Sequence, residues 1–331
     1  MSYKDTKTFL SVLFGVLAII NLTGNILTCI VVKRIISLHT PMYYLLVNLC
    51  VANIIMAVLS AAMYIFSPVY QHPSGQAGDY LCKFITGETI FWIGGFASGF
   101  TLVLIAYERY RAVVYPHDLS TRLNLKRLKI ALAISWICAI LLNLPNFSTI
   151  KVYEVSKTIR VCKEGWEGNT TGKVWSVILV FISFICPLST VSVLYSRTVY
   201  HLYKRQRQII DVSQMAVTKV RKKITIVLIA ITVLFAACWT PDGVTYIYIH
   251  FSKPSTEDSL RGIPIIREVA ILLVCFNSAI HPFLCAFTSQ EIRRGLKKII
   301  CRKKDLLANR PHLQRTSRRL TISLNATKME N

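Results

Sequence analysis

Seven long stretches of mainly apolar residues follow one another along the chain, separated by shorter polar segments. They cover residues 9–32, 43–66, 84–107, 130–150, 174–196, 224–251 and 269–290. A helix needs about 20 such residues to cross the hydrocarbon core of a bilayer. Inside lipid, a loop or an open strand edge leaves backbone groups without hydrogen-bond partners, whereas a helix satisfies its own. The pattern therefore predicts an all-α membrane protein with a bundle of seven transmembrane helices.

The composition agrees with a membrane protein and excludes several other classes. Hydrophobic residues make up 53% of the 331 residues, charged residues make up 17%, and the mean hydropathy is +0.48. A soluble domain carries about 25% charged residues, and a disordered chain has low hydrophobicity. The sequence contains no HExxH, P-loop or Gly-x-Ser-x-Gly motif, so we expect neither an enzyme nor a cofactor. It also lacks internal repeats and rings of intramembrane charge, which makes a transporter or channel the weaker alternative.

The basic residues are distributed unevenly among the polar segments. The net charge is +23, and 28 of the 39 Lys and Arg residues lie in the segments that follow stretches one, three, five and seven. Cytoplasmic segments of membrane proteins carry this kind of excess. We therefore expect a multi-pass plasma-membrane protein with its N-terminus outside and its C-terminus in the cytosol. The basic flanks should attract anionic membrane lipid, and we expect no nucleic acid as a partner.

This orientation divides the chain into four expected parts. Residues 1–8 form an extracellular N-terminus, and residues 9–290 form the seven-helix domain. Residues 289–301 carry apolar side chains on one helical face and basic side chains on the other, which predicts a short amphipathic helix on the cytosolic membrane surface. Residues 302–331 form a cytoplasmic tail that we expect to be disordered.

Two of the ten cysteines lie outside the apolar stretches on the expected extracellular side. Seven others lie within the stretches, where they suit small buried hydrophobes, and Cys301 is cytosolic. Cys82 and Cys162 are therefore the natural pair for a disulfide, with two unpaired thiols as the alternative. Glycosylation sequons lie on the same side at Asn146 and Asn169. Asn169 is the better acceptor, because Asn146 stands close to the lipid.

Short motifs occur in a characteristic order within the seven stretches. They are Gly24-Asn25, Asn48 to Asn53, Glu108-Arg109-Tyr110, Trp136, Pro187 with Tyr195, Phe235, Cys238-Trp239-Thr240-Pro241, Asn277-Ser278 and His281-Pro282. With these motifs the chain resembles the rhodopsin-like (class A) G-protein-coupled receptors over residues 9–301. The resemblance implies palmitoylation at Cys301. It also implies that a set of residues serves activation and G-protein coupling: Glu108, Arg109, Tyr110, Pro187, Tyr195, Phe235, Trp239, Pro241 and Pro282.

Three of these residues have a mechanical interpretation. An arginine at membrane depth is tolerated only where it is paired or wet, so we expect Arg109 to meet the G protein after activation; a topological anchor is the alternative. Pro241 cannot donate a backbone hydrogen bond, so the sixth stretch should kink there and swing as a lever. Trp239 lies just below the expected pocket and should sense the ligand.

The chain departs from the family pattern in the middle of the membrane. Asn53 stands where the family usually has Asp, His281 where it has Asn, and Cys285 where it has Tyr. These positions belong to the family's sodium and water network, so we expect no bound metal and weak or absent regulation by sodium. In addition, Cys82 precedes Arg109 by 27 residues, two more than is usual in the family.

Acids and aromatic residues cluster near the expected extracellular end of three stretches. The predicted ligand-binding residues are Glu88, Phe91, Trp92, Trp239, Asp242, Tyr246 and Glu268. Acids inside a membrane are costly and face the bundle interior or water. We therefore expect Asp242 and Glu88 to bind a cationic group of a ligand between aromatic walls. The alternative is an internal ion pair with Arg267 or His250, or a protonated acid.

The predicted function is that of a receptor that binds an extracellular ligand and activates a heterotrimeric G protein. The loops resemble those of the peptide-receptor branch, which implies a short basic or amidated neuropeptide. A receptor for a small amine or another cationic small molecule is an alternative, and so is a receptor that binds ligand without signalling. The tail segment Arg318-Arg319-Leu320-Thr321 is typical of a kinase target, so receptor kinases and arrestin are expected further partners.

Overall fold

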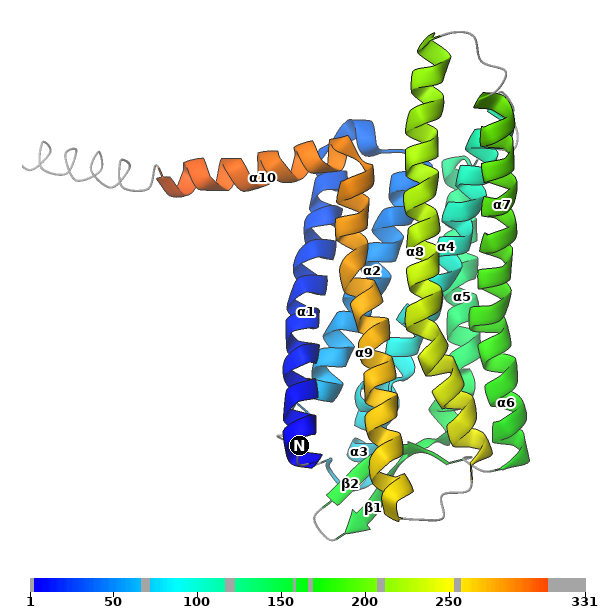
Figure 1. Ribbon diagram of the computed structural model, residues 1–331. Coiled ribbons are helices and arrows are strands. Elements are labelled where there is room, and N and C mark those ends of the chain that lie inside the picture. The colour runs from blue at the N-terminus through cyan, green and yellow to red at the C-terminus, as the bar shows by residue number, and fades with distance from the viewer. Residues whose placement is uncertain are drawn as a thin grey trace, which may run out of the picture.

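The fold is a bundle of long helices that run side by side (Figure 1). It is a computed structural model that describes residues 3–66, 72–116, 123–156, 159–165, 169–206, 212–252 and 257–308. A two-stranded hairpin lies at one end of the bundle, and the helix α10 extends sideways from the other (Figure 1). We call these the hairpin end and the α10 end. The tail residues expected to be a kinase target, Arg318 to Thr321, lie outside the described residues.

Helices account for most of the described chain. The α-helices are α1 Tyr3–Arg34, α2 Pro41–Ala61, α3 Gly75–Leu81, α4 Thr89–Val114, α5 Leu125–Thr149, α6 Thr170–Val180, α7 Cys186–Gln206, α8 Val212–Phe251, α9 Glu257–Thr288 and α10 Gln290–Ala308. Short turns are η1 Ile36–Leu38, η2 Ala62–Phe66, η3 Cys82–Thr86 and η4 Phe181–Ile185, and the strands are β1 Ile150–Ser156 and β2 Ile159–Glu164. Seven helical segments are long and apolar enough to cross a membrane. The seven-helix bundle predicted from the apolar stretches is therefore confirmed.

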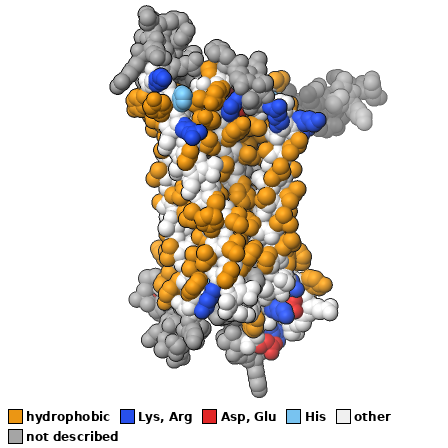
Figure 2. All heavy atoms as spheres, turned by 90° about the vertical axis from the view of Figure 1, so that its right-hand side faces the viewer, with side chains coloured by type: hydrophobic (Ala, Val, Ile, Leu, Met, Phe, Trp, Pro, Cys, Tyr) orange, Lys and Arg blue, Asp and Glu red, His pale blue; other side chains and the backbone are white. Residues whose placement is uncertain are grey.

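Apolar side chains cover the outside of the bundle as well as its core. Figure 2 shows hydrophobic side chains around the middle of the molecule, with Lys and Arg side chains toward both ends. Ile19, Ile137 and Val233 belong to this outer belt and are more than half exposed. A soluble protein rarely exposes an apolar surface of this extent, whereas a lipid-facing surface requires it. Inside the bundle, α4 lies against α2, α5 and α7 and is the most buried of the spans.

Two spans change their geometry near a proline. In the fifth span, the π-turn η4 separates α6 from α7 and ends just before Pro187. A proline removes one backbone donor and disfavours a regular turn before it, and a π-turn is one way to accommodate this. In the sixth span, Pro241 lies inside α8, and the helix bends in the part that leads to the hairpin end (Figure 1). This bend agrees with the kink expected at Pro241.

The third span is interrupted, whereas the apolar stretch 84–107 predicts one continuous helix. The chain passes through α3 and the π-turn η3, breaks at Gly87 and Glu88, and only then enters α4. Glu88 has a φ angle of 68°, a left-handed conformation that costs about 1–3 kcal/mol for a residue with a Cβ atom. A Cβ atom on Gly87 would collide with the backbone oxygen of Cys82, so this close turn requires glycine.

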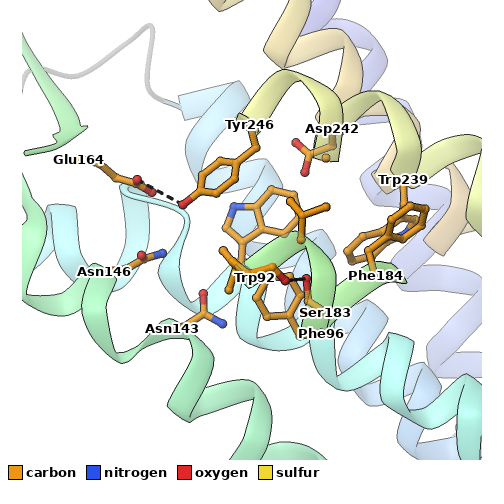
Figure 3. A pocket seen from close by; sticks show the side chains of 13 residues that line it. Trp92, Phe96, Asn143, Asn146, Glu164, Ser183, Phe184, Trp239, Asp242 and Tyr246 are labelled. Atoms are coloured by element: carbon orange, nitrogen blue, oxygen red, sulfur yellow. Dashed lines mark hydrogen bonds between the residues drawn. The ribbon is translucent and has the colours of Figure 1, made fainter. Parts of the chain in front are cut away.

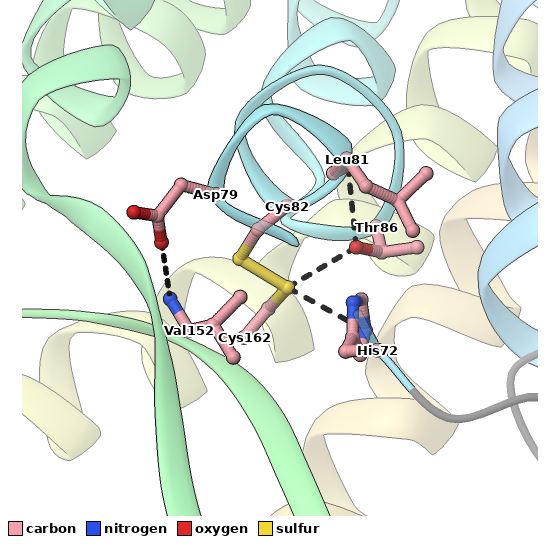
Figure 4. The surroundings of a disulfide bond; sticks show 7 residues. All are labelled: His72, Asp79, Leu81, Cys82, Thr86, Val152 and Cys162. Carbon is pink, nitrogen blue, oxygen red and sulfur yellow. Dashed lines mark hydrogen bonds between the residues drawn. A yellow bond between two sulfur atoms is a disulfide. The ribbon is translucent and has the colours of Figure 1, made fainter. Parts of the chain in front are cut away.

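The hairpin is tied to the top of the third span by two connections. Its strands pair antiparallel, with Val152 opposite Cys162. A disulfide joins Cys162 to Cys82, whose Cα atoms lie 5.7 Å apart (Figure 4). The carboxylate of Asp79 also accepts a hydrogen bond of 3.2 Å from the backbone N–H of Val152. The structure thus contains the disulfide that the distribution of cysteines predicts.

The amphipathic helix α10 packs against the α10 end of α1. Its apolar face is covered: Ile292 is fully buried and Leu296 packs on the core, while the basic residues between them are exposed. Gly295 permits the close approach, because a Cβ atom there would lie 2.6 Å from Val31. The helix ends at Ala308, beyond the predicted limit at residue 301. Part of the tail expected to be disordered is therefore helical, since its Lys and Leu residues favour helix and the next proline comes only at position 311.

Candidate ligand-binding site

A cavity of about 480 Å³, including its open mouth, lies inside the bundle near the hairpin end (Figure 3). Its lining residues come from six elements: Trp92, Phe96, Asn143, Asn146, Glu164, Leu179, Val180, Ser183, Phe184, Trp239, Asp242, Gly243 and Tyr246. Four of the seven predicted ligand-binding residues are among them, namely Trp92, Trp239, Asp242 and Tyr246.

Aromatic rings form the inner limit of the cavity. Trp92 and Trp239 meet edge to face with ring centroids 6.0 Å apart, and Trp239 stacks on Phe235 at 4.8 Å. Gly95 makes room for the tryptophan, because a Cβ atom there would lie 2.9 Å from the Trp239 ring. Phe184 from η4 lies 6.0 Å from Phe235 and completes the cluster. A ligand in the cavity would therefore press on a cluster that contains the predicted activation residues Trp239 and Phe235.

Two acids give the cavity a negative character. Asp242 on α8 is 7% exposed, and its Oδ1 atom has no hydrogen-bond partner among the described residues. The nearest cation is Arg267, whose Nη1 atom lies 4.0 Å away. Glu164 on β2 contacts His250 at 3.2 Å and accepts a hydrogen bond of 3.4 Å from the Tyr246 hydroxyl. A buried carboxylate oxygen without a donor is costly, so Asp242 keeps the capacity to bind a donor or a cation.

Glu88 is engaged inside the protein and does not line the cavity. Its carboxylate accepts hydrogen bonds from Arg267 at 2.6 Å, from the Tyr64 hydroxyl at 2.9 Å and from Trp92 Nε1 at 3.0 Å. The internal ion pair that the sequence left open as an alternative is therefore the arrangement in the structure. Glu88 stands directly before α4, and its carboxylate lies between Trp92, Tyr64 of η2 and Arg267 of α9, outside the cavity lining.

Two other predicted ligand residues also lie outside the cavity lining. Phe91 is fully buried in the core and meets Trp92 edge to face at 5.0 Å, so it supports the cavity wall from behind. Glu268 pairs with Lys7 of α1 beside a second cavity of about 590 Å³ between α1, η2 and α9. The structure therefore does not bring Phe91 and Glu268 together with the four predicted residues that line the main cavity.

Four polar residues of the lining are not among the predicted ligand-binding residues: Glu164, Asn143, Asn146 and Ser183. Glu164 follows Cys162 by two positions, and the disulfide holds this strand over the bundle. That proximity is the signal from which Glu164 could have been identified. Asn143 and Asn146 stand three positions apart in an apolar helix, so they share one face, which is buried. Polar residues inside a membrane usually have a partner or a function.

The two predicted glycan acceptors have different environments. Asn169 stands directly before α6 and is exposed. Asn146 is inside α5, is 3% exposed and lines the cavity. The prediction of a glycan on Asn146 is therefore wrong, because the side chain points into the bundle.

The motif Glu108-Arg109-Tyr110 lies in the last turns of α4, at the α10 end. All three side chains are partly buried. Tyr195 of α7 is buried near Arg109 of α4 and Thr232 of α8. The motif therefore stands where α4, α7 and α8 approach one another, at the end of the bundle opposite to the cavity.

A set of polar side chains joins three spans in the middle of the bundle. Asn53 Nδ2 donates to Asn25 Oδ1 at 3.2 Å and to His281 Nδ1 at 3.1 Å, so this ring nitrogen is an acceptor. Pro282 follows His281 and packs against Gly24 of α1. In the part of the chain that the structure describes, no group of His, Cys, Asp or Glu side chains is arranged to hold a metal ion.

Comparison with known proteins adds an independent finding. The family model described as 7 transmembrane receptor (rhodopsin family) matches residues 24–284. Neuromedin-U receptor 2 of Rattus norvegicus is 26% identical over 312 residues, which cover 90% of this chain and 76% of that protein. The pyroglutamylated RF-amide peptide receptor of Rattus norvegicus is 24% identical over 85% of this chain and 67% of its own length. Neuropeptide FF receptor 2 of Mus musculus is 26% identical over 86% of this chain and 70% of its own length.

Proposed function

Because this chain belongs to the rhodopsin family of seven-transmembrane receptors, we propose that its cavity binds a cationic extracellular peptide and that its α10 end activates a heterotrimeric G protein. The protein is a multi-pass G-protein-coupled receptor of the plasma membrane. We further propose the chemistry of its peptide, its orientation in the membrane and the roles of its individual residues.

In the proposed orientation, the hairpin end faces the outside and the α10 end faces the cytosol. The basic residues support it, because 28 of the 39 Lys and Arg residues lie in the segments that follow the first, third, fifth and seventh apolar stretches, and the described parts of these segments stand at the α10 end (Figure 1). The disulfide at the hairpin end supports it as well, since disulfides persist in oxidising compartments. Residues 1–8 then belong to the extracellular side, and the exposed Asn169 is the proposed glycan acceptor.

The environment of Asp242 is the observation that carries the proposed ligand chemistry. This carboxylate is buried in the cavity wall, and one of its oxygens lacks a hydrogen bond. Arg267 stands 4.0 Å from it and is already bound to Glu88. A cationic group of a ligand would supply the missing partner, and the rings of Trp92 and Tyr246 would flank it. The relatives are named for peptide ligands, which favours a short basic or amidated peptide over a small amine.

The aromatic cluster offers a route from the cavity to the α10 end. A ligand that displaces Trp239 would also displace Phe235, which stacks on it. Both residues precede Pro241 on α8, so their movement would turn the part of α8 that leads to the α10 end. There, Tyr195 and Arg109 would separate and leave Arg109 accessible to the G protein.

At the proposed cytosolic surface, α10 and the tail are expected to contact the membrane and further proteins. The exposed basic residues of α10 would lie against anionic lipid headgroups, with a palmitoyl group on Cys301 as a second anchor. Receptor kinases and arrestin are the proposed partners of the tail that follows.

The proposal is tested by screening the full-length receptor in cells that carry promiscuous G proteins, against short amidated and unamidated peptides and small amines. Arg109→Ala should abolish the response to a hit while binding of that hit persists, because only the coupling residue is removed. Arg111→Ala removes an equal charge two positions away and should keep most of the response. Full signalling by Arg109→Ala at equal surface level would contradict the coupling role, and a response only to amines would replace the peptide.

A further inference from the structure

Two buried carbonyl oxygens of α5 line the cavity without a hydrogen-bond donor. Asn143 is fully buried and Asn146 is 3% exposed, and the Oδ1 atom of each has no partner among the described residues. The amide nitrogen of Asn143 donates one of its two N–H bonds to the backbone oxygen of Ala139 at 2.8 Å, whereas its oxygen accepts no hydrogen bond from the described part of the chain. Figure 3 shows both side chains extending from α5 toward the part of the cavity bounded by Trp92 and Glu164.

Three donors of the cavity lining already donate to other acceptors. Trp92 Nε1 donates to Glu88 at 3.0 Å. The Tyr246 hydroxyl donates to Glu164, and the Ser183 hydroxyl donates to a backbone carbonyl of its own helix at 2.7 Å. Each of these three lining residues would have to give up an existing hydrogen bond to turn to α5. A buried acceptor that the protein itself does not satisfy is usually satisfied by water or by a ligand.

We infer that Asn143 and Asn146 form a subsite for the primary carboxamide of the peptide. This inference rests on the proposed function, since it assumes that the cavity holds a peptide. Side chains three positions apart on a helix have Cβ atoms roughly 5–6 Å apart. The two N–H bonds of a planar NH₂ group diverge, so one such group reaches two acceptors about 5 Å apart. A ligand cation would instead bind the full negative charge of Asp242 or Glu164 in the same cavity.

The subsite would make the receptor selective for peptides that carry an amide. A free C-terminal carboxylate has no hydrogen to donate and would repel the two carbonyl oxygens. A site built around buried hydrogen-bonding groups strongly rejects an analogue that leaves them unpaired. The carboxamide can come from an amidated C-terminus or from the side chain of Asn or Gln, and the two sources need separate probes.

Four small peptides test the subsite on the purified full-length receptor. Acetyl-Arg-Phe-NH₂ carries a terminal carboxamide, and its N,N-dimethylamide has the same shape near the ring but no N–H donor. Acetyl-Arg-Gln methyl ester carries the carboxamide on a side chain, and the corresponding Glu γ-methyl ester lacks it. We expect the peptide with the donor to bind about 10-fold more tightly in at least one pair, the scale of one to two hydrogen bonds. The pair that shows the difference identifies the source of the carboxamide.

Variants of α5 separate recognition from folding. Asn143→Leu and Asn146→Leu should each remove most of the difference within the pair. Without ligand, both variants should melt at the wild-type temperature or above, because an unsatisfied buried carbonyl is removed. Equal binding within both pairs, or no binding of any carboxamide at millimolar concentration, would overturn the inference and leave water as the occupant. A large drop in melting temperature would overturn it too, because the amides would then be structural.

The control for the proposed function is Asp242→Asn. This variant should weaken all four probes by a similar factor, since each carries the same arginine. If Asp242→Asn has no effect while the carboxamide preference persists, the cationic anchor fails and the subsite stands. If Asp242→Asn weakens binding while the preference is absent, the subsite alone fails.

Discussion

At the scale of single residues, Asp242 is a buried acid, and one of its carboxylate oxygens accepts no hydrogen bond from the residues that the structure describes. Asp242→Asn should lower the affinity of a cationic agonist by about 2–4 kcal/mol, the scale for removing one side of a desolvated charge pair. The unliganded receptor should not lose stability, because a buried charge is removed. The measurement is competition binding with the agonist and with an analogue that lacks the cation. Equal losses for both ligands would show that Asp242 is structural.

The neighbouring pair of Glu88 and Arg267 behaves differently, because both charges are satisfied inside the protein. Glu88→Gln or Arg267→Gln alone should destabilise the receptor by about 3 kcal/mol, since each removes the closest ionic partner of the other charge. The double variant should recover part of this loss. Thermal unfolding of the purified receptor measures the cycle.

The pair of Glu154 and Arg160 on the hairpin is a matched control for this cycle. It has a similar contact distance of 2.8 Å, but the side chain of Glu154 is 65% exposed. Exposed pairs contribute about 0–1 kcal/mol, so its cycle should show little coupling. Similar coupling energies for the two pairs would contradict the view that burial gives Glu88 and Arg267 their importance.

At the scale of elements, the hairpin depends on its tie to the third span. Cys82→Ser and Cys162→Ser should each reduce surface expression or ligand affinity, because the hairpin carries Glu164 to the cavity. The double variant should be no worse than either single one, since both remove the same bond. Removal of a native disulfide typically costs about 2–5 kcal/mol. Cell-surface labelling and saturation binding measure the effects.

The same experiment needs a cysteine without a disulfide as its reference. Cys186→Ser is suitable, because this thiol is exposed on α7 and unpaired. It should leave expression and affinity unchanged. Additive losses from Cys82→Ser and Cys162→Ser would mean that the two thiols act separately.

The sequence alone predicts the seven spans but not all of their local structure. Hydropathy predicts all seven spans, because each carries a long run of apolar side chains that outweighs local detail. It cannot detect the break before α4, since the apolar run continues across Gly87 and Glu88. A sequon does not distinguish a buried helix from a loop, so the sequence alone predicts a glycan on the buried Asn146. Glu164 was missed because only the fold brings β2 over the cavity.

At the scale of the whole molecule, the polar centre of the bundle predicts independence from sodium. Asn53 offers a neutral amide, and its neighbour His281 accepts a hydrogen bond from it at 3.1 Å. A neutral amide does not offset the dehydration of a cation, whereas a carboxylate can. Agonist affinity should therefore stay nearly constant when NaCl replaces an inert salt at equal ionic strength. A several-fold drop that is specific to sodium would refute this expectation.

The converse experiment restores the missing charge at this centre. Asn53→Asp combined with His281→Asn should create a sodium-dependent decrease in agonist affinity, because the buried polar residues Ser98, Asn277 and Ser278 occupy the positions that the resemblance assigns to the other sodium ligands. His281→Asn alone should not, since it adds no acid. This single variant is therefore the control for rearrangement of the hydrogen bonds around Asn53.

The break at Gly87 and Glu88 also sets the helical phase of the third span. Each residue of an α-helix turns the chain by about 100°, so two additional residues in a continuous helix would rotate everything before them by about 200°. Cys82 would then point away from the hairpin, or α4 would turn its cavity face toward the lipid. The π-turn η3 and the left-handed Glu88 absorb the extra length. The segment from Cys82 to Arg109 can therefore be two residues longer than is usual in the family. Cys82 still faces the hairpin, and α4 still turns the same face toward the cavity.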